Sequence, residues 1–552
     1  MRFPRLPLPV VLSAFLWAFL PLAAHSEHSA EGSEKSISTA PVYVPLDSWV
    51  YPALHRLAAL GYIPDQVSDS APWTREECRR QIAEAIGNLS SVGDVEALRL
   101  IDDLKAEFPE SRNKTELRLE SIYMRALGIQ GTPLRDSYHF GQTVTNDFGR
   151  PYDGGFNSAV GFSGYGTSGR FSAYLRGEYE QAPGRAPYNP QLQTFVAGID
   201  HNPVQPALGI APASRFEPLE MYVGAQLGFE NITFGKQALW WGPGENSAFA
   251  FSNNASSFYM LRLQQRPLTL PGPLARFAHL RTEIIFGELA GHHWPAKPYL
   301  NAQKISLDLP LGLELGFTRS AIFGGVGRPL TLNSLAQSLF GVNSVDFGPY
   351  GYPDAPGDRH SNFDFRWHLP GVHHLVTIYS DSYADDDPNP LDNPKRSAWA
   401  PGIYFARIPG VKGLDLRFET YATWLYRADY GGNFLYWNGQ YHDSYTNNGN
   451  LLGSWIGRDS RAYVGTSSYW FSAKTKIQGQ YKQIKAGNQF LPGGGTQTDI
   501  SVAAQWAPRP EWLFNAQFQG ERYDIPVLGG VRRNTLASLQ VTYSPENWSL
   551  KR

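Results

Sequence analysis

The feature that most constrains the fold is an alternation of apolar and polar side chains after about Tyr138. In the run "PLEMYVGAQLGFE", every second residue from Leu219 to Phe229 is apolar, whereas the intervening residues are polar, aromatic or glycine. The same period of two appears in "NFDFRWHL", "GLDLRFETYATW", "TDISVAAQWA" and "EWLFNAQFQGERY". Turn-rich stretches such as "NGQYHDSYTNNGN" and "LPGGGTQ" separate these runs. Because a period of two places alternate side chains on opposite faces of a strand, the sequence predicts a large antiparallel sheet.

The alternating runs are better suited to a membrane than to a soluble sandwich. Many are close to the roughly ten residues that a tilted strand needs to cross a bilayer. Charged side chains share the inward positions with glycine, which indicates a wet lumen, and tyrosine and tryptophan gather near the ends of the runs, where interfacial girdles lie. Closing the sheet removes its edges, which hydrocarbon demands because unpaired amides are costly there. We therefore predict a mainly β protein in which residues 131–552 form an outer-membrane β-barrel.

The amino-terminal residues have the pattern of an export signal. Arg2 and Arg5 form a positive segment, "LPLPVVLSAFLWAFLPLAA" follows as an apolar core, and "AHS" supplies a cleavage position. A retained transmembrane helix is the alternative, but prolines interrupt the apolar run and the run is short. We expect a signal peptide over residues 1–26 and a linker over residues 27–42.

Residues 43–130 have a helical period instead. In "DSWVYPALHRLAALGYIP" the apolar residues fall close to one stripe, and Gly61 then ends the helix. In "PWTREECRRQIAEAIG", Thr74 and Glu77 form a capping box, which satisfies amides at a helix start. Further helices are expected over residues 92–108 and 114–127. We predict a small helical domain over residues 43–130, either in the periplasm or as a plug in the lumen.

Composition and motifs limit the classes of function. The 48 basic and 50 acidic residues nearly cancel, so charge gives no reason to expect a nucleic-acid partner. No Walker A or dinucleotide fingerprint stands between a strand and a helix, and no catalytic triad can be defended. These motifs give no reason to expect a cofactor or a metal site. The lone Cys78 cannot form an internal disulfide and is expected to fill space on a helix.

Two groups of potential metal ligands are weighed against simpler uses. The loop "SYADDDPNPLDN" carries Asp385, Asp386, Asp387 and Asp392. Calcium could bind such oxygens, but the loop lacks EF-hand spacing, so we favour a solvated loop. The chain also has two adjacent histidine pairs, His292-His293 and His373-His374. Neighbouring residues point to opposite faces of a strand, so neither pair can easily share one metal.

A stretch beginning at Gly235 concentrates flat aromatic and amide groups. It reads "GKQALWWGPGENSAFAFSNNASSFYMLRLQ". A carbohydrate site needs rings that stack on C–H faces and planar amides that form paired hydrogen bonds. The predicted glycan-binding residues are Trp240, Trp241, Asn253, Asn254 and Tyr259. The turn that would let backbone approach a ligand is Gly242, Pro243 and Gly244. The structural alternatives are an interfacial belt, a capped turn, or a motif that fixes the barrel to its helical plug.

The same stretch carries a resemblance to a known family. "WWGPG…SNNA", found here at residues 240–244 and 252–255, resembles the capsule-assembly proteins of the Wzi type. "LDSWVYPALHRLAALGYI…WTREECRRQIAEA" is similar to the helical segment that precedes the barrel in that family. The resemblance covers most of the chain after the signal. It implies an outer-membrane barrel of about eighteen strands with a small helical bundle, and a surface lectin, not an enzyme, that helps retain capsular or exopolysaccharide.

Several functions remain open at this point. The first is an outer-membrane glycan-binding protein for capsule or exopolysaccharide assembly, monomeric, with polysaccharide and outer-membrane lipid as partners. The second is a porin or transport channel, and the third is a barrel enzyme with a catalytic cluster at one rim. The helical segment also resembles S-layer homology modules, which leaves wall-polymer anchoring and peptidoglycan as alternatives. Outer-membrane barrels generally end on an aromatic residue, and here the last expected strand, "TLASLQVTY", ends at Tyr543 although "SPENWSLKR" follows.

Overall fold

The structure is a computed structural model of the whole chain. It describes residues 40–89, 94–109, 115–201, 209–269, 279–328, 330–340, 357–372, 375–425, 432–545 and 549–551. The expected signal peptide and nearly all of the expected linker lie outside these residues. None of the helices in the described segments is both long and apolar enough to cross a membrane.

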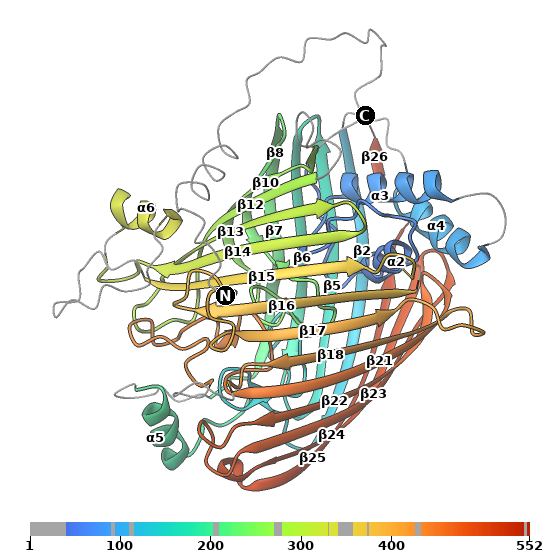
Figure 1. Cartoon of the computed structure of the whole chain (residues 1–552). Coiled ribbons are helices and arrows are strands. Elements are labelled where there is room, and N and C mark those ends of the chain that lie inside the picture. The colour runs from blue at the N-terminus through green and yellow to red at the C-terminus, as the bar shows by residue number, and fades with distance from the viewer. Residues whose placement is uncertain are drawn as a thin grey trace.

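The described chain forms a closed antiparallel β-barrel of 18 long strands (Figure 1). The strands are β2 (Thr115–Gln130), β5 (Gly155–Ser168), β6 (Phe171–Ala182), β7 (Ala213–Leu227), β8 (Glu230–Gln237), β10 (Phe258–Gln265), β12 (His279–Glu288), β13 (Tyr299–Leu309), β14 (Leu313–Phe323), β15 (Asp358–His368), β16 (Val376–Asp385), β17 (Ala398–Phe405), β18 (Leu414–Ala422), β21 (Ser460–Ser472), β22 (Thr475–Ala486), β23 (Gly495–Arg509), β24 (Trp512–Ile525) and β25 (Gly530–Tyr543). The first of them, β2, pairs with the last, β25, and this closes the sheet. The predicted fold class is confirmed.

Shorter elements decorate the barrel. The helices are α2 (Val50–Ala59), α3 (Arg75–Asn88), α4 (Val95–Glu107), α5 (Pro190–Ile199), α6 (Leu332–Phe340) and a 3-10 turn at Pro526–Leu528. The short strands are β1 (Ser70–Ala71), β3 (Arg135–Asp136), β4 (Gly141–Gln142), β9 (Trp240–Trp241), β11 (Leu268–Thr269), β19 (Thr446–Asn447), β20 (Asn450–Leu451) and β26 (Ser549–Lys551). Half of the expected capping box is present: the Thr74 side chain accepts a hydrogen bond from the backbone N of Glu77 at the start of α3, whereas the Glu77 carboxylate accepts from Arg80. The expected space-filling role of Cys78 is also confirmed, since it is fully buried in the helical core.

Alternation along the strands separates an apolar exterior from an interior of mixed polarity. On β7, Met221 and Val223 are exposed on the outer face, whereas Glu220 and Tyr222 are buried on the inner face. Strands β23 and β24 likewise expose large apolar side chains such as Ile500. An apolar outer band is what lipid requires of a membrane barrel.

One predicted helix is wrong. Residues 114–127 were expected to be helical, but residues 115–130 form β2, so the barrel begins at Thr115 and not at residue 131. The segment is rich in Leu, Glu and Arg, which favour helices in isolation. Tertiary pairing overrides this preference, because β2 has partners on both sides, β5 and β25. A register shift between Leu119 and Ser121 also interrupts the alternation that would have indicated a strand.

The two ends of the barrel differ. At one end, which we call the bundle end, strands are joined by short turns at residues 169–170, 228–229, 310–312, 473–474 and 510–511, and helices α2–α4 lie against it. The backbone N of Ala473 donates to Asp103 of α4 (3.0 Å), and Arg407 donates to Asp94 (2.9 Å). At the other end, the loop end, the connections are long and carry α5 and α6, which lie on the left in Figure 1. Outer-membrane barrels have short periplasmic turns and long extracellular loops, so the loop end faces the cell exterior.

Side chains and loops of the described residues fill much of the lumen. Its largest apolar cluster draws on the barrel wall and on the loops at residues 131–154, 238–257 and 432–459. Some inward charged groups, expected to face water, instead bind the segment between α2 and α3. Glu314 on β14 accepts hydrogen bonds from the backbone N atoms of Ser68 (2.6 Å) and Asp69 (3.0 Å).

Strand β25 ends at Tyr543, as expected, and the chain then adds β26 beside β2. The continuation after Tyr543 therefore lengthens the pairing of β2 at residues 116–118.

Candidate functional site

The two tryptophans of the "WWGPG" motif lie inside the barrel. They form β9, which pairs with β1, so that Trp241 lies opposite Ser70. Trp241 is 1% exposed and meets the ring of Phe251 edge-on, with 5.0 Å between ring centroids. Trp240 packs against the helical core, and its Nε1 donates to the carbonyl of Gly244 (3.1 Å). The pair thus joins the helical bundle to the aromatic core of the lumen.

The glycine-proline turn is fitted against the barrel wall. The N–H of Gly242 donates to the carbonyl of Asp69 (2.8 Å), and the residue has a φ of 147°. A Cβ at this position would lie 2.9 Å from Oδ2 of Asp381. The carbonyl of Pro243 accepts a hydrogen bond from Nη2 of Arg366 on β15 (2.6 Å). The turn needs glycine because backbone and wall approach closely here.

The two asparagines join loops. Oδ1 of Asn254 accepts from the backbone N of Asn146 (3.3 Å), and its Nδ2 donates to the carbonyl of Leu451 (3.3 Å). The carbonyl of Asn253 accepts from the backbone N of Phe148 (2.7 Å). Both asparagine side chains are buried. They connect the loops at residues 131–154, 238–257 and 432–459.

Tyr259 does not join the other predicted glycan-binding residues. It lies on β10 and is 49% exposed on the outer face of the barrel, whereas Trp241, Asn253 and Asn254 are buried in the lumen. The structure therefore brings together every predicted residue except Tyr259, but in a position without an open face for a sugar. Direct glycan contact by this motif stays a prediction, and its burial argues for a supporting role.

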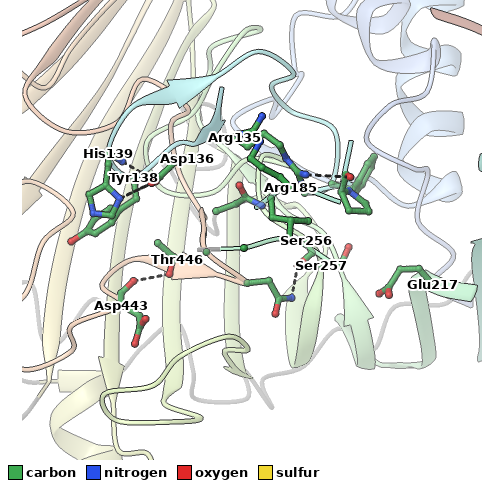
Figure 2. A pocket seen from close by; sticks show the side chains of 18 of the residues that line it. Arg135, Asp136, Tyr138, His139, Arg185, Glu217, Ser256, Ser257, Asp443 and Thr446 are labelled. Atoms are coloured by element: carbon green, nitrogen blue, oxygen red, sulfur yellow. Dashed lines mark hydrogen bonds and ion pairs between the residues drawn. The ribbon is translucent and has the colours of Figure 1, made fainter. Parts of the chain in front are cut away.

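A cavity of about 590 Å3 lies among the loops at the loop end (Figure 2). Figure 2 shows Tyr138 and His139 on one side of it, Glu217 on the other, and Ser256 and Ser257 between. Loops at residues 131–154, 183–201, 209–212, 238–257 and 432–459 line it, together with the ends of β6, β7 and β8. Its polar and aromatic lining residues are Arg135, Asp136, Tyr138, His139, Phe148, Glu180, Arg185, Tyr188, Asp200, Arg215, Glu217, Lys236, Ser256, Ser257, His442, Asp443, Thr446, Asn448 and Asn450.

Charges of both signs line the cavity, and ion pairs fix most of them. Nε of Arg185 lies 2.9 Å from Oδ2 of Asp153, and Lys236 pairs with Glu217. Arg215 is more open: its side chain is 58% exposed, and its Nε lies 3.5 Å from Glu180. Asn448 is also exposed. Guanidinium, carboxylate and amide groups offer the planar, directional hydrogen bonds that hydroxyl-rich ligands need.

A charged network clamps the loops on one side of the cavity. Nδ1 of His139 donates to Asp136 (2.8 Å), and its Nε2 donates to Asp200 (2.7 Å). Asp200 also pairs with Nη1 of Arg458 (2.6 Å). Burial alone would lower the pKa of His139, but the two carboxylates outweigh it and raise the pKa to about 10. A doubly protonated imidazole at neutral pH thus joins two loops at the loop end, and Asp200 links them to a third loop through Arg458.

Sequence reasoning missed this cavity. The run "NGQYHDSYTNNGN" was treated as a divider between strands, yet it supplies His442, Asp443, Thr446, Asn448 and Asn450. Its density of Asn, Asp, Ser and Tyr was a usable signal, because functional residues often stand on loops held by a rigid scaffold.

The predictions on acidic and histidine groups have mixed outcomes. Asp386 and Asp392 are exposed, as a solvated loop requires, but Asp385 is buried at the end of β16, so the prediction is wrong for that residue. Nε2 of His292 donates to the carbonyl of Thr446 (2.8 Å) and His293 pairs with an aspartate. The pair His373-His374 lies outside the described residues.

Comparisons with known proteins agree with the geometry. A curated relative described as an uncharacterized 55.8 kDa protein in the cps region of Klebsiella pneumoniae is 24% identical over 192 residues, which is 32% of this chain and 35% of that protein. The matched part therefore spans about a third of that relative's length.

Among solved structures, the fold is similar to Wzi of Escherichia coli, described as an outer-membrane carbohydrate-binding β-barrel involved in group 1 capsule assembly. The TM-score is 0.66 at 16% identity, with 92% of this chain and 99% of that chain covered. OccAB3 of Acinetobacter baumannii has a TM-score of 0.42 at 11% identity, covering 79% and 99% of the two chains, which is too low to bear on function.

The model of the family "Capsule assembly protein Wzi" matches residues 126–537, a range that runs from β2 to β25. The match includes the motif residues, the cavity loops and most of the barrel wall, and it agrees with an outer-membrane location. This chain therefore belongs to the Wzi family of capsule assembly proteins.

Proposed function

We propose that this chain binds a capsular or extracellular polysaccharide at the cell surface and helps to attach it there, without catalysing a reaction. The observation that carries the proposal is a filled lumen beneath a polar cavity of about 590 Å3 that lies among the external loops. That volume falls within the range of roughly 300–1,000 Å3 that is common for ligand pockets. Family membership and the carbohydrate-binding description of the E. coli protein support the same function.

The chemistry of the cavity suits a saccharide. Sugars present hydroxyl rims, which pair with guanidinium, carboxylate and amide groups, and C–H faces, which pack on rings. The cavity offers Arg215 and Asn448 as open polar groups and Tyr188 as a partly exposed ring. We place the glycan here and give Trp240, Trp241, Asn253 and Asn254 the role of holding the loops that form the cavity. The chain would act as a monomer in contact with outer-membrane lipid.

The test is direct binding with the detergent-folded chain. A glycan array and titration with purified capsular fragments should detect binding, and Arg215→Ala should weaken it by about tenfold, since hydrogen bonds to charged groups contribute roughly 1.5–3 kcal/mol. Arg170→Ala is the matched control, because Arg170 is exposed in a turn at the bundle end and its loss should change nothing.

Two outcomes would contradict the proposal. One is an array without any bound glycan for a chain that migrates as a folded, heat-modifiable barrel. The other is the appearance of cleaved glycan in the same samples, which would favour the enzyme alternative.

A further inference from the structure

Three potential ligands for a cation meet on the inner wall near the loop end. Asp358 and His360 lie two residues apart on β15, so their side chains point to the same face of the sheet. Asp385 on β16 is the direct cross-strand partner of His360. Residues opposite one another across an antiparallel pair have neighbouring side chains, so the sheet itself brings the three together.

The cluster is compact and removed from solvent. The exposed fractions are 0% for Asp358 and 2% for both His360 and Asp385. Nε2 of His360 lies 3.2 Å from Oδ1 of Asp358 and 4.0 Å from Oδ1 of Asp385. One ligand atom from each residue can be chosen so that all lie within 4.8 Å of one another.

The atoms that face one another lack hydrogen-bond partners. Within the described part of the chain, both carboxylate oxygens of Asp358, Oδ1 of Asp385 and Nε2 of His360 accept or donate no hydrogen bond. Among the described residues, neither carboxylate forms an ion pair with an arginine or a lysine. The ion-pair partner of both carboxylates there is His360. Two buried carboxylates without a compensating charge are costly, so something must neutralise them.

The atoms that face away are anchored. Nδ1 of His360 lies 3.3 Å from Oγ of Ser320, and Oδ2 of Asp385 accepts a hydrogen bond from the backbone N of Tyr436 (3.0 Å). Metal-binding histidines and carboxylates are held in this way, with the free nitrogen or oxygen aimed at the ion and the other atom hydrogen-bonded. Tyr383 and Tyr445 pack on the imidazole, with centroid distances of 5.3 and 4.6 Å.

We propose that Asp358, His360 and Asp385 bind one divalent transition-metal ion, with Zn2+ as the best fit. An imidazole nitrogen and two carboxylate oxygens suit zinc, whereas calcium takes six to eight oxygen ligands. A dication would balance the two carboxylates. Since Tyr436 and Tyr445 belong to the loop at residues 432–459, which also lines the cavity, the ion would fix that loop to the barrel wall.

The test measures zinc in the purified full chain, carrying an affinity tag without histidine. After incubation with ZnCl2 and gel filtration, mass spectrometry should find one Zn2+ per wild-type chain and almost none in His360→Gln or Asp385→Asn. Zinc at about a hundredfold excess over its Kd should raise the unfolding temperature of the wild type by on the order of 3 °C and leave both variants unchanged.

His279→Gln is the matched control. His279 lies in a second group of potential ligands, with Asp65 and Asp308, but it is partly exposed. This variant should keep its zinc. The proposal is overturned if the folded wild type retains no zinc, if His360→Gln retains as much as the wild type, or if equimolar Ca2+ displaces the ion. A different result would be that the wild type takes up no zinc and Asp358→Asn unfolds at a higher temperature than the wild type. It would show that a proton, and not a metal ion, neutralises the carboxylates of Asp358 and Asp385.

Discussion

Replacing Trp241 with alanine tests whether the "WWGPG" motif holds the filling of the barrel in place. Trp241 is 1% exposed and forms an edge-on pair with Phe251. Removing a buried tryptophan costs about 3–5 kcal/mol, of which an aromatic pair accounts for about 0.5–1.5 kcal/mol. Because 1.4 kcal/mol corresponds to a factor of ten, local opening around residues 238–257 should become roughly a hundred- to several-thousandfold more frequent.

Hydrogen exchange followed by mass spectrometry measures this opening directly, since it reports local free energies. Peptides from residues 238–257 and 432–459 should lose protection in Trp241→Ala, whereas peptides from β23 and β24 should not. Trp506→Ala is the control, because Trp506 is a tryptophan exposed on the outer face. Unchanged protection of the loops in Trp241→Ala, or an equal loss in Trp506→Ala, would refute the reasoning.

Three further outcomes are expected. The pKa of His139 in the folded chain is about 10, above the value of about 6.5 for a free histidine. Its contacts therefore stabilise the loops fully below pH about 6.5, and this stabilisation is lost as the pH rises through 10. Protease cleavage of the external loops should rise toward pH 10–11 in the wild type and depend less on pH in His139→Gln. Gly242→Ala should lower stability by about 1–3 kcal/mol in thermal unfolding, because of its positive φ and the nearby Asp381, whereas Gly479→Ala, which has open space around it, should not. In planar bilayers the chain should conduct poorly, because apolar clusters fill the lumen, and a conductance of porin size would contradict this expectation.

The sequence predicted the wall of the barrel well and its contents poorly. Lipid on the outer face requires an apolar side chain at every second position of each strand. The alternation in "PLEMYVGAQLGFE" reflects this requirement, so β7 could be recognised from its own residues. The segment 115–130 failed because its helix-favouring residues and its bulge hide a strand whose partners lie far away in sequence.

The interior could not be read from local patterns. Inward charges indicated water, but Glu314 binds Ser68, which is 246 positions away in the chain, and no local signal carries such a pairing. The candidate site shows the same limit. Trp241 and Asn254 stand out in the sequence, but their burial, on which the proposed supporting role rests, depends on loops that are distant in sequence.

The filling of the lumen is not one detachable domain. The segments at residues 131–154, 238–257 and 432–459 are each continuous with wall strands at both of their ends. In the described part of the chain no simple hinge could swing them out together, so we expect a long polymer to be bound outside the barrel and not to pass through it. The order of assembly is constrained as well. These segments must find their places before, or while, the first strand meets the last, since a sealed cylinder leaves little room for threading.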